Sequence, residues 1–151
     1  MARLVFDIET SALPREQFDA VQQEYLFREA ERMPEGGSWE AREAELVQQM
    51  NLWPLTAQVV CIAMLNADTG RGQVLFQAED FEPEAESSPV QFIACPEEVD
   101  VLAGFWEVSK KYEQVITFNG RGFDVPFLYL RSALRNVPIS RKDWLGYRFQ
   151  T

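Results

Sequence analysis

Two acidic side chains near the start of the sequence have the type and spacing that a metal site requires. Asp7 and Glu9 are two residues apart, within and just after an apolar run at 3–8 that predicts a central strand buried on both faces. Residues i and i+2 of a strand project to the same side, so both carboxylates can converge on one cation. Hard divalent cations prefer oxygen ligands, and they assist the cleavage of phosphodiesters. An Asp-x-Glu pair also occurs by chance in many proteins, so the pair alone is a weak indication.

A third acidic residue follows a second predicted strand. Residues 115–118 are a short apolar run, residues 119–123 form a loop with two glycines, and Asp124 opens a predicted helix. Aspartate is a favoured residue at a helix start and glycine in a loop, so this segment alone is equally well explained as a capping motif. Its meaning changes when it is taken together with Asp7 and Glu9.

The residue types that are missing narrow the chemistry. The sequence has no histidine, which excludes Ser-His-Asp and Cys-His nucleophile arrangements and histidine-ligated zinc within this chain. Its two cysteines are Cys61 and Cys95, and Cys61 stands in an apolar run, so neither a disulfide framework nor a zinc cluster is expected. Any catalysis must therefore rest on carboxylates.

The charge of the chain is unevenly distributed. Its net charge of −10 argues against a generic nucleic-acid-binding surface. Residues 1–100 carry 6 basic and 20 acidic residues, whereas residues 101–151 carry 8 basic and 4 acidic residues. The basic side chains of the last third could face a phosphate backbone, and a solvated helix face is an equally good explanation for each of them. They include Arg121, Arg131, Arg135, Arg141, Lys142 and Arg148.

The elements that must position the acids follow from the apolar pattern and the turn residues. Residues 16–33 and 38–51 predict two helices separated by a breaker at 34–37, and residues 58–66 and 73–78 predict a β-hairpin. Residues 79–90 predict an exposed loop. A helix from Pro96 to about Tyr112 precedes the second strand, and the helix from Asp124 stops at 136–138. This order predicts an α/β sheet with antiparallel and parallel members, whose last strand is joined through a helical crossover.

Length and composition indicate one domain over residues 1–151, with an acidic helical insertion at about 14–55. The first residues lack a positively charged leader with an apolar stretch, and no apolar run approaches the roughly 20 residues of a membrane span. We therefore expect a cytoplasmic protein without a membrane segment.

Together, the two acidic segments resemble motifs I and II of the DEDD superfamily of 3′→5′ exonucleases, which have a ribonuclease-H-like fold. The likeness is greatest to the proofreading exonuclease domain of family B DNA polymerases and its stand-alone bacterial relatives. Phe6-Asp7-Ile8-Glu9-Thr10 matches the first motif, and Asn119 followed by Phe123-Asp124-Val125-Pro126-Phe127-Leu128 matches the second. The resemblance also covers the hairpin preceded by Pro54, and so most of the chain except the insertion.

The resemblance implies a site for Mg²⁺ or Mn²⁺ and a two-metal mechanism. Asp7 would bridge two metal ions, Glu9 would hold one of them and orient the attacking water, and Asp124 would bind the second ion, partly through water. The substrates implied are the 3′ ends of single-stranded DNA or RNA. Protein partners are not implied.

The resemblance also assigns residues that would bind the substrate. Thr10 would contact the terminal 3′-hydroxyl, and Leu13 would wedge against the terminal base. Asn119, Phe123 and Phe127 would shape the path of the strand. Each of these side chains also has a purely structural explanation, and Leu13 and Phe127 in particular suit a core.

The chain departs from the family pattern at the third motif. That motif, Tyr-x-x-x-Asp or His-x-x-x-x-Asp, supplies a fourth carboxylate, and neither pattern occurs in this sequence. We therefore expect a ribonuclease-H-like mixed sheet with flanking helices, incomplete at its C-terminal side, and a chain with weak or no activity by itself. The alternative is a catalytically inactive ribonuclease-H-like module that binds nucleic acid or a protein partner.

Overall fold

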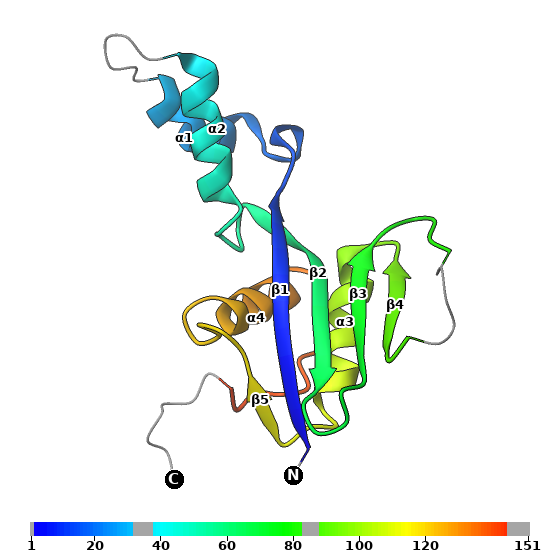
Figure 1. Cartoon of the computed structure of the whole chain (residues 1–151). Coiled ribbons are helices and arrows are strands. Elements are labelled where there is room, and N and C mark those ends of the chain that lie inside the picture. The colour runs from blue at the N-terminus through cyan, green and yellow to red at the C-terminus, as the bar shows by residue number, and fades with distance from the viewer. Residues whose placement is uncertain (1, 32–37, 83–87, 145–151) are drawn as a thin grey trace. The chain divides into compact units, whose positions relative to one another are not determined.

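A computed structural model describes residues 2–31, 38–82 and 88–144 of the chain (Figure 1). The breaker predicted at 34–37 and Arg148 lie outside these residues. The elements in chain order are β1 (Arg3–Ala12), a 3₁₀ turn (Arg15–Gln17), α1 (Ala20–Glu31), α2 (Trp39–Met50), β2 (Ala57–Asn66), β3 (Gly72–Gln77), β4 (Val90–Cys95), α3 (Glu98–Ser109), β5 (Gln114–Ile116) and α4 (Asp124–Leu134).

The strands form one mixed sheet in the order β4-β3-β2-β1-β5. β2 and β3 pair antiparallel, which confirms the predicted hairpin, and β1 pairs in parallel with β5, with Val5 opposite Ile116. α3 precedes β5 in the chain and serves as the helical crossover that parallel pairing requires. The prediction of an α/β mixed sheet with flanking helices is confirmed.

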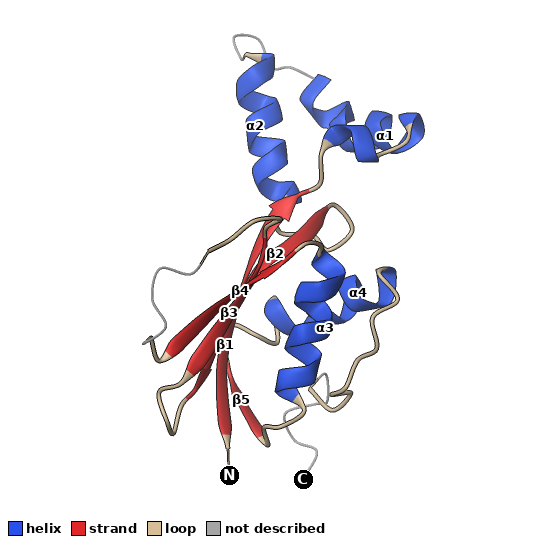
Figure 2. Ribbon diagram, turned by 90° about the vertical axis from the view of Figure 1, so that its right-hand side faces the viewer, coloured by secondary structure: helices blue, strands red, loops and turns tan. Residues whose placement is uncertain are grey.

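The chain divides into two compact units, and each is described by itself. The first unit comprises Met1–Glu9 and Val59–Thr151, and the second comprises Thr10–Gln58. Within the first unit, α3 and α4 lie on one side of the sheet (Figure 2). Its core is aromatic. The Phe6 ring lies 5.1 Å from the Phe105 ring and 5.8 Å from the Trp144 ring, and Trp106 Nε1 donates to Ser132 Oγ at 2.7 Å.

The prediction that β1 is buried on both faces is wrong. Leu4, Phe6 and Ile8 are buried on the helix side, whereas Asp7 and Glu9 on the other side are exposed. The strand also runs on to Ala12, beyond the predicted end at residue 8. The strand predicted at 115–118 is shorter than expected, since β5 ends at Ile116. Thus one face of the sheet in the first unit remains open to solvent among the described residues.

One strand was not predicted. β4 follows the acidic segment predicted as a loop and pairs in parallel with β3, from Gly72 opposite Val90 to Gln77 opposite Cys95. It is an edge strand, and Phe92 and Ile93 remain 51% and 38% exposed. A short edge strand buries little apolar surface, so its sequence carries a weaker pattern than that of a central strand.

The second unit has its own small core between α1 and α2. Phe18, Phe27 and Met50 are buried there, and Ala12, Leu13, Leu26 and Leu46 pack against them. Ser38 caps α2 by accepting a hydrogen bond from the Ala41 N–H at 3.2 Å. Both predicted helices are present, although α1 begins at Ala20, after the separate 3₁₀ turn, rather than at residue 16.

Candidate active site

The first two carboxylates lie on the open face of the sheet. Asp7 and Glu9 alternate along β1 with the buried Phe6 and Ile8, so both side chains point away from the helices into solvent. Exposure leaves their oxygens free to take ligands other than protein donors. The strand thus presents two oxygen ligands on one side, as the spacing predicted.

The loop after β5 turns the chain back toward β1. Asn119 adopts a φ of 52°, and its carbonyl accepts hydrogen bonds from the N–H groups of Gly122 and Phe123 at 2.9 and 3.0 Å. Asparagine tolerates this left-handed conformation better than most residues. A Cβ at Gly120 would lie 1.8 Å from Thr117 Cγ2, so the turn is too tight for a side chain there. The loop therefore places the start of α4 close to the end of β5.

Asp124 is the first residue of α4 and is only 2% exposed. Burial raises the pKa of its carboxyl group, and the nearby negative charge of Asp7 raises that pKa further. Its own backbone, the Thr117 hydroxyl and the Ile8 backbone partly oppose this rise. The carboxyl group of Asp124 is therefore influenced by residues of β1, although Asp124 comes 117 positions after Asp7 in the sequence.

A thiol shares the environment of the two exposed acids. Cys61 of β2 is half-buried, and its pKa is raised by burial and then by the charges of Glu9 and Asp7. The charges of Glu9 and Asp7 thus act on Cys61 of the neighbouring strand β2, and the charge of Asp7 acts on Asp124 as well. Sequence reasoning placed Cys61 in the core, because the register that brings β2 beside β1 cannot be read from the sequence.

The donor chemistry of these acids fits a hard cation, since all the candidate ligands are carboxylate oxygens. Asp7 and Asp124 influence each other electrostatically, which is the repulsion that a divalent cation relieves. Among the residues described by the structure, however, no three acidic, cysteine or histidine side chains are assembled closely enough to hold one ion. The charge of Asp7 acts on Asp124, and a cation held by all three acids would require Glu9 to approach them.

The residues predicted to bind substrate fall into two groups. In the second unit, the Thr10 hydroxyl donates to the Asn51 carbonyl at 2.7 Å, and Leu13 packs against that unit's core. In the first unit, Phe127 is 1% exposed and is a core residue, and the half-buried Phe123 ring lies 5.4 Å from it. Asn119 is exposed and shapes the loop through its backbone.

For Arg131 the structure contradicts both explanations of the basic side chains, because Arg131 is neither solvated nor free to face a phosphate. Arg131 is 5% exposed and makes a bidentate ion pair with Glu98, at 2.8 and 2.6 Å, so it cannot face a phosphate backbone. Arg135 pairs with Glu97 and Glu98, and Arg141 pairs with Asp143. Arg121 and Lys142 are exposed.

Sequence reasoning also missed Phe118. This residue was predicted to lie in a buried strand, but it is 91% exposed in the loop just after β5. Its position two residues beyond Ile116, which pairs with Val5, brings it to the part of the sheet that carries Asp7. An alternation count from the end of the strand is the one signal that could have indicated its exposure.

The fold and the acids define the class of protein: an α/β domain whose candidate chemistry rests on carboxylates. The chain belongs to the family described as predicted 3′–5′ exonucleases related to the exonuclease domain of PolB, whose model matches residues 53–145. The matched range contains Asp124 but neither Asp7 nor Glu9. Membership of this family confirms the resemblance drawn from the motifs.

Similar proteins are archaeal DNA polymerases. The chain is 27% identical over 79 residues to DNA polymerase 1 of Sulfolobus acidocaldarius. The aligned residues are 52% of this chain and 9% of the polymerase. The family B DNA polymerase of Pyrobaculum calidifontis is a similar solved structure, with a TM-score of 0.49 and 22% identity over 97% of this chain and 12% of the polymerase. The chain thus spans about a tenth of the length of these relatives. No described helix is long and apolar enough to cross a membrane.

Proposed function

We propose that this chain carries the carboxylate centre of a metal-dependent 3′→5′ exonuclease. The observation that supports the proposal is that the charge of Asp7 raises the pKa of the buried Asp124, so that two acids from distant segments of the chain repel each other. Such mutual repulsion disfavours the folded chain unless a ligand relieves it, and a divalent cation does so. Membership of an exonuclease family supports the same chemistry.

In this proposal Asp7, Glu9 and Asp124 hold Mg²⁺ or Mn²⁺, and a metal ion supplies a nucleophilic water and stabilises negative charge on the phosphate. Asp7 is central because it shares one side of β1 with Glu9 and its charge acts on Asp124. Glu9 extends the site along the strand. The buried Asp124 fixes the side of the site toward α4. Its burial keeps the carboxyl group in place while the exposed acids adapt.

The substrate in this proposal is the 3′ end of single-stranded DNA or RNA. Phe118 offers an exposed ring just beyond the end of β5, the strand beside β1, on which a base can stack. Thr10, Leu13, Asn119 and Phe123 remain proposed contacts to the strand, whereas the burial of Phe127 limits it to supporting Phe123. A cytoplasmic location stays a prediction.

The test is release of nucleotides from a 3′-labelled single strand in Mn²⁺, in this chain and in a version extended along its gene. We expect activity in the extended version, weaker or none in the chain alone, and loss in both on Asp7→Ala. Glu107→Ala is the matched control, because Glu107 is an exposed acid whose ion-pair partner is Lys110 on the same surface. Activity that survives Asp7→Ala would contradict the proposal.

A second candidate function is an inactive module that binds nucleic acid or a protein. It is favoured by the net charge of −10 and by the lack of a preassembled set of three ligands among the described residues. In that case neither version digests the strand in Mn²⁺, and Asp7→Ala leaves binding to the same strand unchanged. The two functions are thus separated by one set of variants.

A further inference from the structure

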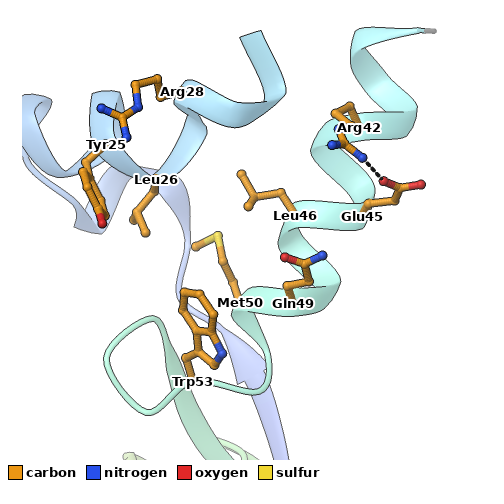
Figure 3. Close-up of a pocket in the computed structure, with 9 residues that line it drawn as sticks. All are labelled: Tyr25, Leu26, Arg28, Arg42, Glu45, Leu46, Gln49, Met50 and Trp53. Atoms are coloured by element: carbon orange, nitrogen blue, oxygen red, sulfur yellow. Dashed lines mark hydrogen bonds and ion pairs between the residues drawn. The ribbon is translucent and has the colours of Figure 1, made fainter. Parts of the chain in front are cut away.

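The second unit contains a pocket between α1 and α2 with a volume of about 310 Å³ (Figure 3). Leu26 of α1 and Leu46 and Met50 of α2 point toward one another and form an apolar floor, and Tyr25 and Trp53 stand beside it. This volume lies at the lower end of the range for small-molecule pockets, roughly 300–1,000 Å³. The pocket therefore has the size for one small organic ligand.

Two aromatic rings of the pocket are left in solvent. Tyr25 is 70% exposed and Trp53 is 57% exposed, although rings of this kind normally bury most of their surface. Exposed rings next to an apolar floor offer stacking surfaces for a flat ring, and base-on-aromatic stacking accepts any nucleobase. Gln49, also exposed at the pocket, adds an amide that can both donate to and accept from a polar ring edge.

The pocket gathers positive charge in a stretch that is otherwise acidic. Residues 10–58 contain four arginines and nine acidic residues, and two of the arginines, Arg28 and Arg42, line the pocket. The Arg28 guanidinium lies 5.5 Å from the centre of the Tyr25 ring. Arg42 pairs with Glu45 at 2.8 Å, and both partners are about half-exposed. An exposed pair of this kind contributes little stability, so an anionic ligand can take over the guanidinium.

We propose that this pocket binds a nucleoside monophosphate group, with the base against Tyr25 and Trp53 and the phosphate at Arg28 and Arg42. The inference rests on the proposed exonuclease function for the source of the ligand, which is either the released product or one nucleotide of the bound strand. Two arginines and one acid, Glu45, line the pocket, so its own side chains carry a net positive charge. Charges beyond the Debye length of about 8 Å are largely screened, so more distant acids of the unit act less on a nucleotide in the pocket.

The test is calorimetric titration of the full chain with AMP, adenosine and inorganic phosphate, in EDTA so that no metal ion occupies the carboxylates. We expect AMP to bind more tightly than adenosine or phosphate. Trp53→Ala removes a ring that stacks on the base, and Arg42→Gln removes a guanidinium that binds the phosphate. Each should weaken AMP binding about tenfold. Glu45→Gln should tighten it, because it releases Arg42 from its ion pair. Arg3→Gln is the matched control, since Arg3 pairs with Asp68 in the other unit and both partners are about half-exposed.

A thymidine pentamer separates the two sources of the nucleotide. Tighter binding of the pentamer than of AMP, with the same dependence on Trp53 and Arg42, assigns the pocket to the strand, and the reverse order assigns it to free product. Absence of AMP binding, or AMP binding that Trp53→Ala and Arg42→Gln leave unchanged, would overturn the proposal. Binding of an acidic, apolar peptide in the pocket, without displacement by AMP, would also overturn the proposal. Because titration in EDTA needs no catalysis, failure of the nuclease assay leaves the binding result readable.

Discussion

At the scale of single residues, Asp124 occupies the least favourable position of the three candidate ligands. It is almost fully buried, it lies near the charge of Asp7, and both effects raise its pKa. A carboxyl group whose pKa is raised in the folded state binds protons more readily there than in the unfolded chain. In the absence of metal, this residue therefore lowers the stability of the folded chain at neutral pH.

We expect Asp124→Asn to raise the melting temperature of the metal-free chain at pH 7 by a few degrees. The destabilisation by the Asp124 carboxylate, which the substitution removes, is fully present when the pH is above the raised pKa of the folded state. It disappears when the pH falls below the unfolded-state pKa of 3.8. The difference between variant and wild type should therefore shrink as the pH falls toward 4. Thermal unfolding in EDTA at several pH values measures it.

Asp68→Asn provides a control of opposite sign. Hydrogen bonds from Arg3 lower the pKa of this exposed carboxyl group, so its replacement should not raise the melting temperature at pH 7. If Asp124→Asn lowers the melting temperature as Asp68→Asn does, the carboxylate of Asp124 is stabilised by its surroundings, and the account of the site is wrong.

The three acids could be named as candidate ligands from sequence, because their spacing relative to strands and a helix start is local information. The place of Cys61 beside β1 could not be predicted, since β2 and β1 are neighbours only in the folded sheet. The exposed ring of Phe118 and the buried ion pair of Arg131 were predicted with the opposite burial. The sequence of a strand end is the same whether solvent or protein covers its side chains, and so is that of a helix face.

At the scale of elements, a buried ion pair joins the two helices behind the sheet. Glu98 at the start of α3 accepts from both Arg131 of α4 and the backbone N–H of Val59 in β2, the latter at 2.9 Å. The first turn of α3 is closed by a capping box between Glu97 and Asp100. This network fixes α4, whose first residue is Asp124, against α3 and the sheet.

Arg131→Met should lower the free energy of unfolding by about 3–5 kcal/mol, because the buried Glu98 carboxylate loses its bidentate partner and keeps only the longer ion pair with Arg135 at 3.5 Å. The double variant Glu98→Met/Arg131→Met should recover part of the loss, since no charge is then left unpaired. Urea denaturation of the variants measures both effects.

Arg42→Met tests an exposed pair in the same way. Its ion pair with Glu45 is solvated, so its loss should cost about 1 kcal/mol or less. A loss for Arg131→Met as small as that for Arg42→Met would show that the network does not hold α4 in place.

The order of the elements was largely predictable, because helices, turns and the hairpin follow from local patterns. The edge strand β4 was not, because a parallel partner for β3 gives no hairpin signal and the strand is half-exposed. The long β1 was underestimated for a related reason. Beyond Ile8 the strand continues with three consecutive polar residues, Glu9, Thr10 and Ser11, which resemble a loop in sequence.

At the scale of the whole molecule, the chain holds two separate apolar cores, one in each unit. Phe27 is 2% exposed at the centre of the smaller core, and Arg15 lies over its ring at 4.3 Å. The larger core around Phe6 and Phe105 shares no residue with it. We therefore expect the two units to differ in stability.

Phe27→Ala should remove about 3–5 kcal/mol from the smaller core and leave the larger one intact. In hydrogen exchange, the amides of α1 and α2 should lose protection while those of β2, β3 and α3 keep it. Tyr25→Ala, which replaces an exposed ring, should change neither set. Loss of protection throughout the chain would show instead that the two units fold as one.

The measurement that tests the central claim most directly is titration of the chain with Mn²⁺, followed by the electron paramagnetic resonance signal of the free ion. The account predicts binding that is weakened about tenfold or more by each of Asp7→Asn, Glu9→Gln and Asp124→Asn, and unchanged by Glu107→Gln. Mn²⁺ binding that none of the three substitutions affects would contradict a metal centre at these carboxylates.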